Sequence, residues 1–152
     1  MAGYKELIAD LSDRLGEDLF PDIHGVVTLI VEKRVKFHIE SDSVEEFMIL
    51  GATISELPPG KFRENILKDA LKANSRINVN PGVLSYAGRE NLLVIHTKLF
   101  IQGTSVDEMI LRIKQLTSRA KKWMGAINEG RSCPDDELPK KSGLSGKGMF
   151  GF

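Results

Sequence analysis

The sequence has few of the features that mark exported or membrane-spanning proteins. Among its 152 residues there is a single cysteine, Cys133, so no internal disulfide can form and a reducing compartment is expected. The longest apolar runs, residues 25–31 and 47–54, are far shorter than the roughly 20 residues that cross a bilayer. The first ten residues lack a basic region followed by an apolar run and a cleavage site. The sequence therefore predicts a cytoplasmic protein without membrane insertion.

An excess of charge of either sign is also missing. The chain has 21 Lys and Arg residues and 21 Asp and Glu residues, so its formal net charge is zero at pH 7. Such a chain has no overall field to attract nucleic acid or an anionic membrane. Its 41% hydrophobic content is enough for one buried core. We expect one domain, residues 1–130, and a flexible, glycine-rich tail, residues 131–152.

Patterns of catalytic or metal-binding residues are scarce. His24, His38 and His96 fall in three separate segments, and none has a second ligand-type residue at zinc spacing. Exposed histidines on strands and loops are the simpler interpretation. Cys133 lies close to the acidic run 135–137, which does not favour a nucleophilic thiolate. These residues predict no enzyme activity and no metal.

A glycine-rich stretch, residues 143–148, superficially resembles a phosphate-binding loop. It has Gly148 where Ser or Thr should follow the lysine, and no predicted strand precedes it. We interpret it as linker sequence and expect no cofactor.

Apolar periodicity, by contrast, is well developed and predicts an order of elements over residues 4–129. Apolar residues recur every three or four positions in the first helix, at Tyr4, Leu7, Ile8, Leu11 and Leu15. The further predicted elements are strands at 26–32, 36–40 and 47–54, a helix at 62–73, strands at 83–87 and 92–101, and a helix from 106 that Thr104 or Ser105 caps. Closely joined strands pair antiparallel. The predicted class is α+β: helix, three strands, helix, two strands, helix, with a curved antiparallel sheet.

Two of these elements leave alternatives open. The strand 26–32 is almost continuously apolar, which indicates a strand that is covered on both faces or that lies at a subunit boundary. Apolar residues seven positions apart in the last helix, beginning at Val106, fit either a helix that covers the core or a seam for a partner.

The apolar helix faces exceed what a small sheet can bury. Three amphipathic helices share only five predicted strands, so one stripe faces another chain. The candidates are the second and the first helix. The alternative is that all the stripes belong to one monomeric core.

The order of elements resembles the class I type III secretion chaperones, a small effector-binding family related to the Tir chaperone. The resemblance rests on the first helix, the strand 47–54 ending in Leu57-Pro58-Pro59, the helix 62–73 and the hairpin 83–100. It implies a homodimer formed by the middle helix and adjoining strand, through Phe62, Ile66, Leu67, Ala70, Leu71 and Leu84. It also implies that an extended effector segment, the guest, binds apolar grooves and adds a strand to a sheet edge. The implied groove residues are Leu7, Leu11, Leu15, Phe37, Ile39 and Met48.

The function that this resemblance implies is that of a non-enzymatic, ATP-independent chaperone. It would bind the N-terminal chaperone-binding segment of secreted effector proteins and keep that segment soluble and export-competent. The alternative is a chaperone-like regulatory or scaffolding protein that binds a transcription or secretion-apparatus component. The tail, residues 131–152, is a candidate contact for the secretion ATPase or a partner chaperone, or has no role.

Overall fold

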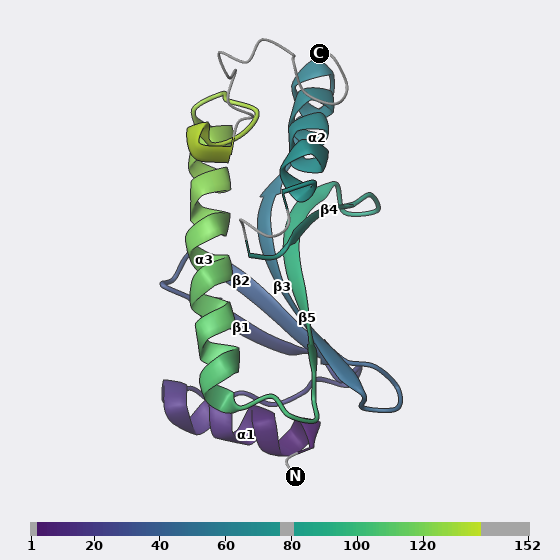
Figure 1. Cartoon of the computed structure of the whole chain (residues 1–152), viewed down its shortest axis with the longest axis vertical. Coiled ribbons are helices and arrows are strands. Elements are labelled where there is room, and N and C mark those ends of the chain that lie inside the picture. Colours follow the sequence, from purple (N-terminus) through teal and green to yellow (C-terminus); the bar gives the residue numbers. More distant parts are fainter. Residues whose placement is uncertain (1–2, 77–80, 138–152) are drawn as a thin grey trace.

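Three α-helices and one five-stranded sheet make up the described part of the chain (Figure 1). The computed structural model describes residues 3–76 and 81–137. In chain order the elements are α1 (Tyr4–Leu15), β1 (Val27–Val31), β2 (Val35–Ser41), β3 (Phe47–Glu56), α2 (Lys61–Asn74), β4 (Val83–Ala87), β5 (Leu92–Phe100), α3 (Val106–Asn128) and the 3-10 turn η1 (Asp135–Glu137). The α+β class and the predicted order of helices and strands are confirmed.

The sheet is antiparallel throughout, with the strand order β1-β2-β3-β5-β4. The longest pair, β3 and β5, lies at its centre, and its register shifts between Thr53 and Ser55. Such a bulge bends a strand and increases its twist. Within the described residues, β1 and β4 have one neighbouring strand each and form the two edges of the sheet.

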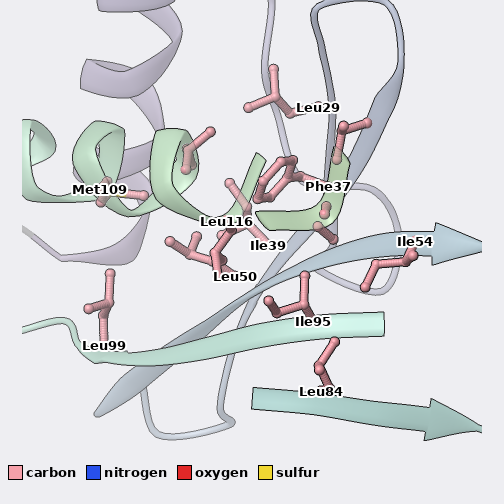
Figure 2. Close-up of a cluster of buried hydrophobic side chains, with 14 of the residues drawn as sticks. Leu29, Phe37, Ile39, Leu50, Ile54, Leu84, Ile95, Leu99, Met109 and Leu116 are labelled. Atoms are coloured by element: carbon pink, nitrogen blue, oxygen red, sulfur yellow. The ribbon is translucent and has the colours of Figure 1, made fainter. Parts of the chain in front are cut away.

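A helical layer covers one face of the sheet. α3 lies along the sheet, and α1 packs near the start of α3 (Figure 1). Figure 2 shows Phe37, Ile39 and Leu50 of β2 and β3 converging with Leu116 of α3. All four side chains are buried, and each such burial stabilises the fold by about 2 kcal/mol. The interpretation of α3 as a core-covering helix is thereby confirmed.

The opposite face of the sheet carries exposed and half-buried side chains. In β1, Val27 and Leu29 are buried while Thr28 and Ile30 point outward and are exposed. Of the two alternatives for this strand, coverage on both faces is therefore wrong for the described part of the single chain, and a position at a subunit boundary stays a prediction. Its nearly continuous apolar sequence fits an edge whose outer face is available to another chain.

Helix ends follow local rules. The side chain of Ser105 accepts a hydrogen bond from the Glu108 N–H at 3.1 Å, which makes it the N-cap of α3 and settles the choice between Thr104 and Ser105. α1 ends at Gly16, whose φ of 67° lies in the left-handed region that glycine adopts without strain. These caps define the C-terminal end of α1 and the N-terminal end of α3.

The chain continues past α3 as a packed segment, residues 131–137. Arg119 and Glu137 form an ion pair at 2.7 Å that is almost fully buried, and the Trp123 indole N–H donates to Glu137 at 3.0 Å. The Ser132 hydroxyl donates to Asp69 of α2. This segment therefore joins α2 to α3, while the rest of the predicted tail, residues 138–152, lies outside the described residues. No helix in the described ranges is long and apolar enough to cross a bilayer.

Candidate functional site

The described residues do not assemble a metal cluster. Within residues 3–76 and 81–137, no three His, Cys, Asp or Glu side chains lie close enough together to hold a metal ion. His24 and His38 are exposed, and His96 lies half-buried on β5 with its Nδ1 3.3 Å from the Ser85 hydroxyl. Burial raises the pKa of the Cys133 thiol to about 11, so this thiol is protonated and unreactive at neutral pH.

The first candidate surface is a hollow beside the free edge of β1. It has a volume of about 190 Å³ and lies between the end of α1, the edge strand and α3. Its lining is mostly apolar, with Leu15, Leu29, Ile30, Val31, Ile110 and Ile113, and it also includes the charged residues Glu17, Glu32 and Lys114. We call this hollow, together with the edge of β1, the apolar edge groove. It combines unpaired strand backbone with apolar side chains, which is what an added strand needs.

Local contacts hold the walls of this groove in place. The Tyr4 hydroxyl of α1 donates to the Ile39 carbonyl of β2 at 3.0 Å, and burial raises the pKa of Tyr4 to about 12. At the other end of α1, Arg14 forms an ion pair with Asp107 in the first turn of α3. α1 is thus fastened to both the sheet and α3.

The turn between β1 and β2 forms another wall. Glu32 and Lys33 have positive φ values of 55° and 57°, a left-handed conformation that costs non-glycine residues roughly 1–2 kcal/mol each. The turn is tight although it lacks the Asn-Gly pair that favours such turns. Lys121 of α3 pairs with Glu32 at 2.7 Å and holds the turn against the helix.

The six side chains predicted to contact a guest lie in two different settings. Leu15 is 37% exposed and lines the apolar edge groove. The other five are buried inside the protomer: Leu7, Leu11, Phe37, Ile39 and Met48. Guest contact by these five stays a prediction, and in this conformation they form the core beneath the groove. The apolar residues absent from the predicted groove are Leu29, Ile30, Val31, Ile110 and Ile113. The signal for Ile30 was the almost continuously apolar sequence of its strand, which also fits a strand at a subunit boundary.

The second candidate surface lies between α2 and β4, at the far edge of the sheet. It holds an apolar hollow of about 200 Å³ lined by Leu67, Ala70, Leu71, Leu84, Ser85, Tyr86 and Leu93. We call it the α2–β4 surface. Leu71 is 71% exposed beside it. Asn74 fixes the geometry, because its side-chain amide donates to the Leu84 carbonyl at 2.7 Å and its oxygen accepts from the Leu84 N–H at 2.8 Å.

The structure brings four of the six predicted dimer residues together at this surface, namely Leu67, Ala70, Leu71 and Leu84. Ile66 is fully buried in the protomer core, and Phe62 is half-buried against that core. Dimerisation itself stays a prediction. Asn74 was missed because its partner Leu84 lies ten residues further along the chain.

Comparison with known proteins identifies the fold. The chain is similar to a chain in the crystal structure of the ExsC–ExsE complex, with a TM-score of 0.68, 15% identity, and coverage of 80% of this chain and 90% of that one. It is also similar to a chain of the HopA1–SchA chaperone–effector complex, with a TM-score of 0.66, 19% identity, and coverage of 81% and 94%. A third similar structure is that of the Yersinia pestis type III secretion chaperone SycH in complex with a stable fragment of YscM2, with a TM-score of 0.62, 17% identity, and coverage of 78% and 97%.

Because these sequence identities are low, the structural similarity establishes the shared fold alone. No curated protein sequence matches the chain at a significant level. The model of the Tir chaperone protein (CesT) family matches residues 6–124, which run from the first turn of α1 through most of α3. Since this match covers both candidate surfaces and most of the sequence, the chain belongs to the Tir chaperone protein (CesT) family.

Proposed function

We propose that this protein is a non-enzymatic, ATP-independent type III secretion chaperone of the bacterial cytoplasm. It binds the N-terminal chaperone-binding segment of a secreted effector and keeps that segment soluble and export-competent. The observation that carries the proposal is the apolar edge groove, in a chain of the CesT family. Similar structures include a chaperone–effector complex, which supports the same role here.

Binding at this groove follows from strand geometry. An extended guest segment adds to the free edge of β1 and satisfies the backbone groups that have no neighbouring strand among residues 3–76 and 81–137. Alternate side chains of an extended segment point to the same side, so every second guest residue enters the hollow beside Leu15, Ile110 and Ile113. The guest orders as it binds, which lowers affinity per unit of area but permits a long wrapped contact.

A homodimer completes the proposed assembly. Two copies pack through the α2–β4 surface, where Leu71 is exposed next to an apolar hollow. A two-fold contact of this kind buries the same patch on both copies. The edge of β1 lies at the opposite side of the sheet from β4, so each protomer keeps its groove free in the dimer.

Co-purification tests the proposed function. The chaperone is isolated with its bound protein from native cytosol, digested lightly with protease, and the protected fragment is identified by mass spectrometry. We expect a secreted protein protected near its N-terminus. Recovery of a transcription or secretion-apparatus component, such as the secretion ATPase, would instead favour the regulatory or scaffolding alternative.

A matched pair of variants locates the binding site. Ile30→Asp changes a side chain that is 54% exposed on β1, so the protomer folds while the groove acquires a charge. We expect the protected fragment to be lost. Val44→Asp, an exposed apolar position in the turn between β2 and β3, should retain it. Equal recovery from both variants would contradict the assignment of the apolar edge groove.

A further inference from the structure

Two further hollows lie next to the apolar edge groove along α3 and share lining residues with it. A hollow of about 750 Å³ lies between the β1–β2 turn and α3, and a third one, of about 390 Å³, lies against the same turns of α3 on the flank that faces Pro81 and Glu137. Lys114 lines all three hollows. Val31 and Glu32 are shared by the first two, and Ser118 and Lys122 by the last two. A chain that leaves the edge of β1 therefore has a continuous path.

The chemistry of the lining changes along this path. The apolar residues of the edge groove give way to Arg34, Lys114, Lys121 and Lys122, which we call the cationic groove. Lys121 pairs with Glu32 at 2.7 Å and Lys122 with Asp136 at 2.8 Å. Four cations facing two carboxylates leave a net charge of +2. Across the described ranges of the chain, Arg34 and Lys114 form no ion pair.

The length of the path suits a short piece of polypeptide. From Lys114 to Lys122, the span of the cationic groove on α3, the helix advances about 12 Å, at about 1.5 Å per residue. An extended chain, which advances about 3.3 Å per residue, covers this length in about four residues. A single small anion would fill only a small part of it.

We infer that the guest carries a run of about four residues rich in Asp and Glu next to its apolar anchor, and that this acidic run lies in the cationic groove. The inference rests on the proposed function, because the acidic run belongs to the same guest. The apolar anchor supplies buried area at β1. The carboxylates pair with Arg34 and Lys114, which are exposed and form no ion pair with any other described residue.

An apolar groove followed by a cationic groove fixes the orientation in which the guest strand binds. Complementary charge contributes to association rate and to the choice of partner more than to affinity. A segment with its acidic run on the wrong side of the anchor would leave Arg34 and Lys114 unpaired. The cationic groove therefore selects one orientation of an otherwise sequence-tolerant strand.

The test uses hexaglutamate as a probe that does not depend on knowing the guest. Titration into the isotopically labelled full-length protein at low salt is followed by NMR. We expect shifts at the amides of Arg34, Lys114, Lys121 and Lys122, and weakening of binding when salt is raised. The double variant Arg34→Glu/Lys114→Glu should bind about fivefold to tenfold more weakly. Lys72→Glu, an exposed position on α2, is the control with the same type of charge change and should bind like the wild type.

Three results of the peptide titration would overturn the inference: no shifts in the cationic groove, unchanged affinity of the double variant, or tighter binding of a hexanucleotide than of hexaglutamate. The last result would assign the groove to phosphate instead of carboxylate. A captured effector fragment that binds the double variant as well as the wild type would also overturn it, and would leave the proposed chaperone function standing. Loss of effector capture by the wild type, with hexaglutamate still bound in the groove, would remove the proposed function and leave the cationic groove as a site for acidic peptide.

Discussion

Tyr4 shows how one side chain fastens a helix to the sheet. Its hydroxyl donates to the Ile39 carbonyl inside the protomer, and burial raises its pKa to about 12. Tyr4→Phe keeps the ring and removes the donor, so we expect a loss of about 1 kcal/mol in the free energy of unfolding. Urea denaturation measures this loss. Unchanged stability would show that the hydrogen bond adds nothing in water.

His96 makes stability depend on pH. Burial lowers its pKa below the ordinary value of 6.5, so the folded protein binds the proton less readily than the unfolded chain. The unfolded chain takes up this proton first as the pH falls. The stabilising contribution of neutral His96 is therefore complete above pH 6.5 and is lost as the pH drops from there toward the folded pKa.

The corresponding variant is His96→Gln, which cannot titrate. We expect its free energy of unfolding to fall less than that of the wild type between about pH 7 and pH 5. NMR titration of the wild-type imidazole gives the pKa directly. A value at or above 6.5 would contradict the effect of burial.

At the scale of elements, the segment that follows α3 acts as a strap. Glu137 accepts hydrogen bonds from Arg119 and Trp123, while Arg119 also donates to the carbonyls of Pro81 and Gly82, at 2.9 and 3.0 Å, just before β4. One buried carboxylate thus holds together the segment 131–137, α3 and the start of β4.

Removing that carboxylate leaves a buried, unpaired guanidinium. We expect Glu137→Ala to destabilise the protein by about 3–5 kcal/mol. The neighbouring change Asp136→Asn breaks an exposed pair with Lys122 and should cost at most about 1 kcal/mol. Thermal and urea unfolding of the two variants gives the comparison. Similar losses would show that the buried network does not hold the strap.

The elements themselves could be predicted from sequence because their signals are local. The alternation of Phe37 and Ile39 with polar neighbours shows which face of β2 is buried, and the stripe from Tyr4 to Leu11 does the same for α1. Leu15 belongs to the same stripe, but it lies one turn further on, where α1 borders the hollow. The apolar periodicity of a helix does not show at which residue the helix extends beyond the elements that pack against it.

Partners distant in sequence account for what was missed. Glu137 stands in an acidic run that looks solvated, yet Arg119 and Trp123, 18 and 14 residues earlier, bury it. Asn74 resembles a simple helix end, yet it binds the backbone of β4. The composition of a segment does not reveal such contacts, because they depend on how the elements pack.

At the scale of the whole molecule, the two edges of the sheet carry the two surfaces to which we assign separate roles. The β1 edge carries the apolar edge groove and leads into the cationic groove, while the β4 edge carries the α2–β4 surface. Separation of this kind allows dimerisation and guest capture to be changed independently. A variant at one edge should leave the other function intact.

The oligomeric state tests this division. Leu71→Asp places a charge on each copy of an exposed apolar position at the α2–β4 surface, where desolvation and like-charge repulsion both oppose packing. By light scattering at micromolar concentration, we expect the wild type at twice the protomer mass of 16.9 kDa and this variant at the protomer mass. Val44→Asp, at the turn between β2 and β3, should remain a dimer. A monomeric wild type would refute the dimer, and a dimeric Leu71→Asp would move the contact to another surface.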